Sequence, residues 1–432
     1  MNKLFQTIKD IYQIKELRVR VRNTFFFLLF FRAGTVVVLP GIDMERLSSN
    51  VKGMLGLLDS FLGSSFSRAS VFALGVAPYI SASIVMHLLA IAWPKVQKIQ
   101  REGEVGRRRI AQITRKLTIF IAIFQSFQYI LFTSREGVVA INQTLFMVMA
   151  IIILTAGTLF CMWLGEQLTD RGIGNGVTML IMVGIVSSFP AALYQEAQHR
   201  GSKGMFVFML ELLLLFFILV VVVAFTQATR KVPIQYAKQL SSSTVYGGQR
   251  QYLPFKLNSV GVMPIIFANM LVFLVTLLLR IKWLGGKFAW LMDISNKLQD
   301  ATSWLYNVLF GLLIILFTFF YTAFTVNPVQ IAEDMKRNGS FIPGIASGNA
   351  TACFLDNVLE RITFYSAIFL AAIAVLPLFA RMAGLSSNFS QFYGGSALLI
   401  MVGSMLEIIQ QMESYLLMRR YELIINKGAR IR

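Results

Sequence analysis

The sequence predicts an all-α integral membrane protein, and three observations support this fold class. Apolar residues make up 56% of the chain and charged residues 14%, which leaves too little polar surface for a soluble globule of 432 residues. Apolar runs long enough to cross a hydrocarbon core recur along the chain. The stretch Arg68–Ala90 combines membrane length with Gly75, Pro78, Ser81 and Ser83, and such small and helix-bending residues suit a helix that lines or gates a passage.

Ten membrane spans are expected, because a span needs about 20 predominantly apolar residues. The expected spans are 24–39, 71–91, 117–132, 145–164, 177–189, 205–226, 260–279, 304–326, 362–380 and 392–412. The fifth is short and follows a glycine-rich run, Gly172–Gly176. Met1–Arg22 is basic and amphipathic and is followed by no small-residue cleavage site, so no cleavable signal is expected.

The distribution of basic residues predicts the orientation. Most of the 40 Lys and Arg residues lie in the amino-terminal tail and in alternate loops, which places both termini in the cytosol by the positive-inside rule. The net charge of +19 and the cluster Arg107–Arg109 are compatible with nucleic-acid binding, but membrane topology accounts for most of this charge. The cytosolic face remains basic enough to meet an acidic or RNA-containing partner.

Residues suited to catalysis are scarce, so an enzyme is not expected. The chain has 2 histidines and contains no HExxH helix, Walker A loop or GxSxG elbow, and we expect no metal or cofactor. Arg32, Glu211, Glu407 and His87 are the ionisable candidates within or beside the spans. Structural pairing or interfacial placement is favoured for them, with ion coupling as the alternative.

A segment between the first two spans is amphipathic and too short to cross the membrane. It lies within Pro40–Ser67, and its apolar positions include Leu55, Leu58, Phe61 and Leu62. We interpret it as a short re-entrant or capping helix, since non-spanning backbone is tolerated at membrane depth only inside protein or a wet cavity. A helix lying on the outer interface is the alternative.

Two long cytosolic loops are candidate docking sites. Arg230–Asn258 alternates polar and apolar residues on both sides of a turn predicted at Gly247-Gly248, which is typical of a hairpin. The second loop, Asn327–Glu360, carries Lys336 and Arg337. Loops of this length usually serve a function, although a solvated charge distribution without one remains the alternative.

Ordered motifs connect the chain to a known family. They are PGI at Pro40–Ile42, the Arg68–Leu89 segment, GIGNG at Gly172–Gly176, LPFKLN running into GVMPIIFA at Leu253–Ala268, and NP with FIPGI at Asn327–Ile345. Together they closely resemble SecY, the channel-forming family of the Sec protein translocase (SecY/Sec61-alpha), from about residue 18 to residue 428. The resemblance implies two inverted pseudo-symmetric halves, 1–189 and 190–432, around a central pore, with a plug at about 54–67 and cytosolic loops at about 227–258 and 327–361.

The resemblance also implies a hydrophobic pore ring. Its members would be Ile80 and Ile84, Ile181 and Ile185, Ile266 and Ile400. The first two pairs are each four residues apart, so each pair shares one helix face. A constriction of aliphatic side chains excludes water and ions by dewetting and makes no sequence-specific bond to a passing polypeptide. Ordinary helix packing is the alternative for any one of these isoleucines.

A plug and a lateral gate are implied in the same way. The plug corresponds to the amphipathic segment with Leu55, Leu58, Phe61 and Leu62. The gate, between the second and seventh spans, would use the side chains of Pro78, Ser81, Ser83, Asn258, Pro264 and Asn269. Small polar contacts hold such a seam weakly, at about 0.6 kcal/mol per interhelical hydrogen bond.

The chain departs from the family at both loop tips. Ala346 and Ser347 stand where the family commonly has an arginine and a proline, and Ser241–Thr244 replaces the usual paired arginines. These departures put the detailed docking chemistry with a motor or ribosome in doubt. The docking residues assigned in their place are Lys238, Arg250, Lys336 and Arg337.

The function implied is a passive protein-conducting channel that translocates unfolded secretory polypeptides and releases transmembrane segments into membrane lipid. Its expected partners are SecE-like and SecG-like membrane subunits, a SecA-type motor ATPase, the ribosome, signal sequences and nascent polypeptides. The expected location is the bacterial inner (plasma) membrane, with a thylakoid also compatible. The alternative from another class is a secondary transporter of a small solute, which would need a defined polar site near mid-membrane.

Overall fold

The computed structural model describes residues 14–42, 65–66, 68–133, 142–201, 204–236, 239–241, 244–246, 250–258, 261–279 and 303–429. The chain forms two compact units, one made of Met1–His199 with Ile400–Arg432 and the other of Arg200–Leu399. The expected symmetry between residues 1–189 and 190–432 stays a prediction.

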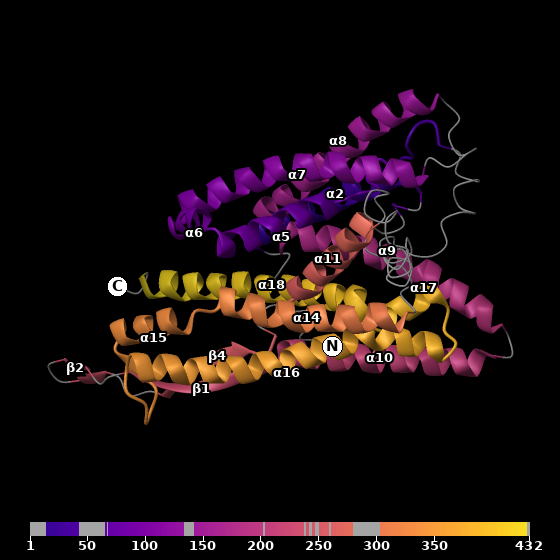
Figure 1. Ribbon diagram of the computed structural model, residues 1–432. Coiled ribbons are helices and arrows are strands. Elements are labelled where there is room, and N and C mark those ends of the chain that lie inside the picture. Colours follow the sequence, from indigo (N-terminus) through magenta and orange to yellow (C-terminus); the bar gives the residue numbers. More distant parts are fainter. Residues whose placement is uncertain are drawn as a thin grey trace. The chain divides into compact units, whose positions relative to one another are not determined.

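The first unit is helical in its described part (Figure 1). It contains α2 (Lys15–Val36), α5 (Ala77–Ala92), α6 (Pro94–Arg101), α7 (Glu104–Thr133), α8 (Gln143–Arg171), α9 (Gly176–Arg200) and most of α18 (Gly395–Ala429). Helix α7 packs against α5 and α8, and α2 packs against α8. Leu39, Phe66, Tyr129, Phe146 and Leu154 belong to one buried cluster in this unit.

The second unit combines helices with a small sheet (Figure 1). Its elements are α10 (Met205–Gln227), β1 (Thr229–Tyr236), β2 (Gln239–Ser241), β3 (Thr244–Tyr246), β4 (Arg250–Lys256), α11 (Met263–Leu279), α14 (Trp304–Thr325), α15 (Pro328–Arg337), β5 (Ser340–Phe341), α16 (Asn349–Met382), α17 (Ser387–Ser390) and the 3-10 helix η2 (Gln391–Tyr393). Helix α14 packs along α16 and also contacts α11.

A helix covers at least part of each expected span, in the expected order. Six helices of the described chain are long and apolar enough to cross a membrane: Gln143–Arg171, Gly176–Arg200, Met205–Gln227, Trp304–Arg337, Asn349–Met382 and Gly395–Met418. A seventh span results if Ala77–Ala90 and Pro94–Gln100, bent by 105°, are counted together. The total of ten spans stays a prediction.

The second expected span begins later than the sequence pattern indicated. Residues before Ala77 form turns, and the backbone of Val38 and Ser70 makes an isolated antiparallel bridge. Gly75 has φ 48°, a left-handed conformation that an α-helix does not contain. Pro78 therefore lies in the first turn of α5, where its missing N–H breaks no helical hydrogen bond, and the expectation of a mid-helix proline was wrong.

The helix of the fifth expected span is longer than the sequence pattern predicted. Helix α9 continues through Pro190 to Arg200. The side chains of Ser187 and Ser188 donate to the carbonyls of Gly184 and Ile185, at 2.7 and 2.8 Å. Neither bond reaches the carbonyl of Val186, which loses its helical donor because Pro190 has no N–H. A membrane helix tolerates such a loss where its surroundings compensate it, so proline alone did not mark the end of this helix.

The expected hairpin is present, and it joins a larger sheet. Strands β1 and β4 pair antiparallel from Thr229 opposite Lys256 to Gln235 opposite Arg250. Strands β2 and β3 form a second ladder, with Ser241 opposite Thr244, so the chain reverses between these two residues. The expected turn at Gly247-Gly248 lies outside the described residues. On its other side β1 pairs with β5, giving the order β4-β1-β5.

Candidate functional site

The first four predicted ring residues lie on two helices of the first unit. Ile80 and Ile84 are on α5 and are each 7% exposed. Ile181 and Ile185 are on α9 and are buried as well. Each pair is separated by one helical turn and therefore shares a face of its helix, as the spacing predicts.

The other two predicted ring residues are also buried. Ile266 lies on α11, in the second unit, and Ile400 lies on α18, at the start of the segment that belongs to the first unit. Burial of an isoleucine fits both a closed aliphatic constriction and ordinary packing. The convergence of the six side chains on one constriction stays a prediction.

The serines of the predicted gate on α5 make local contacts. The hydroxyl of Ser81 donates to the carbonyl of Ala77 at 3.1 Å and accepts from the amide of Gln125 on α7 at 3.5 Å. The ring nitrogen Nδ1 of His87 lies 2.6 Å from the carbonyl oxygen of Ser83 and 3.4 Å from its hydroxyl. His87, one of the ionisable candidates, therefore has the structural contacts that the sequence favoured.

The predicted gate residues of the second unit include two asparagines with buried amide atoms. Oδ1 of Asn258, just after β4, and Nδ2 of Asn269, on α11, are buried without a hydrogen-bond partner in the described part of the chain. Pro264 is in the first turn of α11 and is buried. Their role in a gate stays a prediction.

The predicted plug residues Leu55, Leu58, Phe61 and Leu62 lie outside the described residues. Residues that follow them in the chain are fixed to the first unit. The hydroxyl of Tyr129 on α7 donates to the carbonyl of Phe66 at 2.8 Å, and their rings meet edge to face at 4.7 Å. The amide of Ser70 donates to the carbonyl of Ser65 at 3.1 Å. Ser65 and Phe66 are therefore held by contacts within the first unit.

The GIGNG run is fixed by residues that the sequence analysis did not identify. The amide of Ile173 donates to the hydroxyl of Thr24 at 3.1 Å, and Arg20 donates to the carbonyl of Gly172 at 3.1 Å. Gln411 on α18 accepts from the amide of Gly174. No local pattern marks these partners, because they are about 150 to 240 positions distant in the chain.

The glycines of this run allow a close helix approach. A Cβ at Gly176 would lie 1.9 Å from the carbonyl oxygen of Gly165 on α8, which no side chain can occupy. Asn175 and Thr169 complete the turn, since Oδ1 of Asn175 accepts from the amide of Val177 and the hydroxyl of Thr169 accepts from the amide of Gly176. The run is thus a structural junction between α8 and α9.

The two long loops that were predicted to be cytosolic form one folded body. Val232 and Ile234 from β1, Met335 from α15, Ile342 after β5, and Leu355 from α16 make a common apolar core. The start of α15 is capped by Asn327, whose Oδ1 accepts from the amides of the second and third residues of the helix, with Pro328 at its first position. The two loops, which the sequence analysis treated as separate docking sites, are therefore held together by one core.

The structure describes some of the predicted docking residues and not others. Lys336 and Arg337 are exposed at the carboxy-terminal end of α15. Arg250 begins β4, with its backbone opposite Gln235, and Lys238 lies outside the described residues. Arg230 is exposed on the same sheet and adds positive charge that the docking assignment had left out.

Glu211, the buried acidic candidate in the sixth span, is paired. Its Oε1 lies 2.5 Å from Nη2 of Arg200, which also donates to the carbonyl of Gly384 at 3.0 Å. The hydroxyl of Tyr393 donates to the backbone carbonyl of Glu211 at 2.6 Å. This arrangement is a structural ion pair between Arg200, the last residue of α9, and Glu211 of α10, as the sequence analysis favoured.

The fold and the sequence have clear relatives. The SecY family profile matches residues 70–409. The chain is 37% identical over 438 residues to the protein translocase subunit SecY of Thermotoga maritima, covering 98% of this chain and 99% of that protein. Three solved structures each cover 92% of this chain and 92% of their own chains. They are "The structure of a protein conducting channel" (TM-score 0.67, 16% identity), a structure on the plug domain of SecY and the closed state of the translocation channel (0.64, 17%), and Sec61 in a canine ribosome-channel complex (0.62, 16%).

The fold is therefore that of the SecY/Sec61 channels, an all-α membrane architecture. The chain belongs to the SecY family.

Proposed function

We propose that this chain forms a passive channel that translocates unfolded secretory polypeptides and releases transmembrane segments sideways into lipid. The observation that carries the proposal is membership of the SecY family over nearly the whole chain. The burial of all six isoleucines at the predicted ring positions supports it, since an aliphatic constriction needs side chains withdrawn from water. The proposed gate uses Pro78, Ser81 and Ser83 opposite Asn258, Pro264 and Asn269.

The chain has no nucleotide-binding motif, so energy for transport would come from partners. We assign these roles to a SecA-type motor ATPase and to the ribosome, with SecE-like and SecG-like subunits beside the chain in the membrane. The ribosome assignment is supported by the similarity to Sec61 in a ribosome-channel complex. The positive charges of Arg230, Arg250, Lys336 and Arg337, together with that of Lys238, suit either partner.

The proposed location is the bacterial inner membrane with both termini in the cytosol, because the basic loops then lie on the cytosolic side. Proteoliposomes with the SecE-like and SecG-like subunits, a SecA-type ATPase and ATP provide the test. A secretory precursor should become protected from external protease, and the protection should require ATP. Lack of protection together with saturable uptake of a small solute would favour the transporter alternative.

A further inference from the structure

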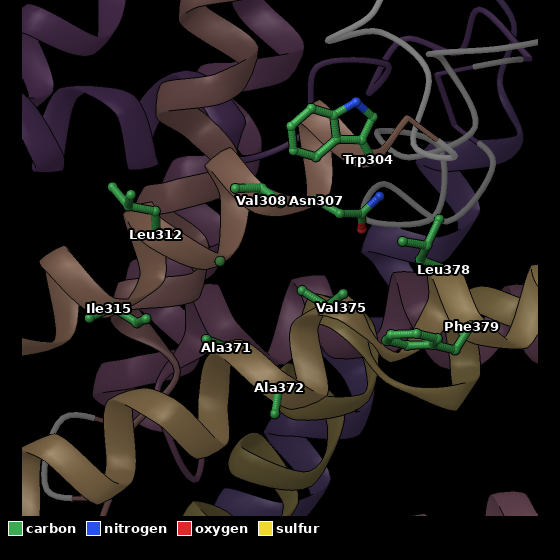
Figure 2. A pocket seen from close by; sticks show the side chains of 11 residues that line it. Trp304, Asn307, Val308, Leu312, Ile315, Ala371, Ala372, Val375, Leu378 and Phe379 are labelled. Atoms are coloured by element: carbon green, nitrogen blue, oxygen red, sulfur yellow. The ribbon is translucent and has the colours of Figure 1, made fainter.

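The second unit contains an apolar groove whose role the channel function does not explain. It lies between α14 and α16 and has a volume of about 740 Å³. Its walls are formed by the residues Trp304, Asn307, Val308, Gly311, Leu312, Ile315, Ala371, Ala372, Val375, Leu378 and Phe379. Figure 2 shows Val308, Leu312 and Ile315 along one wall and Ala371 and Val375 along the facing wall.

The groove offers contacts for hydrocarbon and little else. Asn307 is the polar side chain of the lining, and its Nδ2 donates to the carbonyl of Ser303 at 2.9 Å, within its own helix. The remaining lining residues are aliphatic or aromatic, apart from Gly311. An occupant that presented hydrogen-bonding groups here would lose its water without replacement, which is costly in an apolar site.

The length of the groove matches one membrane leaflet. Trp304 to Ile315 is eleven helical steps, or about 16 Å at ~1.5 Å per residue. Half of a hydrocarbon core of ~30 Å is about 15 Å. A transmembrane partner helix needs a surface that continues through both leaflets, whereas an acyl chain from one leaflet needs a groove of this length.

The position of the groove supports the same occupant. It lies at the amino-terminal end of α14 and the carboxy-terminal end of α16, which is the end away from the sheet β4-β1-β5 (Figure 1). It is open to the outside of the protein, since the lining residues Val308 and Leu312 are 54% and 56% exposed. Trp304, 71% exposed, lies at its mouth, where indole is favoured at the boundary between hydrocarbon and headgroups.

We propose that this groove binds an acyl chain of a glycerophospholipid from the leaflet opposite the β sheet. The bound chain fills the space between α14 and α16 and supplies the packing contacts that the two helices do not make with each other there. This inference requires that the chain spans a membrane and does not depend on which solute or polypeptide it transports.

The test uses the complex reconstituted in nanodiscs of phosphatidylethanolamine and phosphatidylglycerol with a trace phospholipid that carries a diazirine on its acyl chain. After illumination, mass spectrometry locates the labelled residues. Val308 and Leu312 should be labelled more strongly than Leu213 and Phe216 of α10, which are 69% and 68% exposed and serve as the measure of bulk lipid contact. Equal or weaker labelling in the groove would overturn the proposal.

A substitution that fills the groove provides the second arm. At Gly311 an added Cβ would make ordinary contacts, 3.7 Å from Val375 and 4.0 Å from Ala371, so Gly311→Leu places a side chain in the groove without displacing backbone. The excess labelling at Val308 should then fall to the level at Phe216. Leu316→Phe, on the same helix outside the lining, should leave it unchanged. Ala372→Leu, at an exposed lining position, repeats the test if Gly311→Leu does not fold.

If a protein partner occupied the groove, cross-linking from position 308 would yield a peptide of that partner. Labelling of the groove residues by the diazirine lipid would then be reduced. That result would also overturn the proposal.

Discussion

The hydroxyl of Tyr129 donates a hydrogen bond of 2.8 Å to the backbone carbonyl of Phe66. This contact joins α7 to the carboxy-terminal end of the predicted plug segment, about 54–67, and both side chains are buried. The same carbonyl accepts from the backbone amide of Ala69 at 3.3 Å, and the shorter bond from the tyrosine hydroxyl attaches it to α7.

Replacement of this hydroxyl tests whether the contact keeps the plug in its resting position. Tyr129→Phe retains the ring contact with Phe66 and removes the hydrogen bond, at a cost of about 1 kcal/mol or more. We expect more frequent brief openings of the resting channel, measured as ion conductance in planar bilayers, with normal expression. Tyr194→Phe, at an exposed position on α9, is the matched control. Wild-type conductance in Tyr129→Phe would show that this bond does not support the closed state.

The pore ring predicts a leak when it is made polar. Replacing Ile84 and Ile185 together with asparagine should let water wet the constriction and allow ions through the resting channel. Each single substitution should do less, because the remaining aliphatic side chains still exclude water. Ile152→Asn on α8, where the native side chain is 63% exposed, controls for the polar substitution itself. A double variant that conducts no more than wild type contradicts the ring assignment.

The plug segment should be dispensable for folding. Deletion of residues 54–64 leaves Ser65 in place, whose carbonyl accepts from the amide of Ser70 and helps to form the turn before α5. We expect a folded, translocating channel that seals poorly and accepts defective signal sequences more readily. The measurements are precursor protection in proteoliposomes and ion flux in parallel. Loss of membrane insertion after this deletion would assign the segment a structural role.

Apolar length predicted the order of the helices, because each run of membrane length has to satisfy its backbone internally. It could not predict the start of α5 at Ala77, which depends on the left-handed backbone of Gly75 and on the bridge between Val38 and Ser70. Strand β5 has 2 residues, too few for any periodic signal, and its pairing with β1 is a tertiary contact.

In the candidate site, too, some features could be predicted from the sequence and others could not. The spacing of Ile80 with Ile84 and of Ile181 with Ile185 follows from helix geometry and was visible in the sequence. The hydrogen-bond partners of the GIGNG run could not be predicted, because Thr24 and Gln411 contact it only after α2 and α18 have packed in the first unit. Residue type alone does not distinguish such a partner from any other surface threonine or glutamine.

The proposed docking residues predict salt-dependent binding of a partner. Changing Lys238, Arg250, Lys336 and Arg337 to glutamate should weaken binding of the motor or ribosome, and the loss should be larger at low salt. Exposed charges interact over a screening length of about 8 Å at 0.15 M ionic strength and further at lower salt. Ion leakage should stay at the wild-type level. The measurement is partner binding to the reconstituted variant at two salt concentrations.

A matched charge change separates docking from net charge. Lys95 and Lys98 on α6 and Arg107 and Lys116 on α7 are exposed and lie outside the body formed by the two loops. Changing these four residues to glutamate alters the net charge as much as the quadruple variant does, but it should weaken binding less. Equal affinity of the quadruple variant and wild type at both salt concentrations would exclude docking by these charges.

Two helical glycines should respond in opposite ways to the same substitution. Gly176→Ala places a Cβ 1.9 Å from the carbonyl oxygen of Gly165, and backbone cannot yield as a flexible side chain does, so α8 and α9 have to separate. We expect a loss of about 2 kcal/mol or more in stability, in the range of overpacked sites. Gly311→Ala meets ordinary contacts and gains up to ~1 kcal/mol from the better helix propensity of alanine. The measurement is thermal unfolding of both purified variants in detergent, followed by loss of the monodisperse peak in size-exclusion chromatography. The midpoint temperature of Gly176→Ala should be lower than that of wild type, and the midpoint of Gly311→Ala should be equal or higher. An unchanged midpoint for Gly176→Ala would mean that α8 and α9 do not approach each other closely enough at Gly176 to exclude a methyl group.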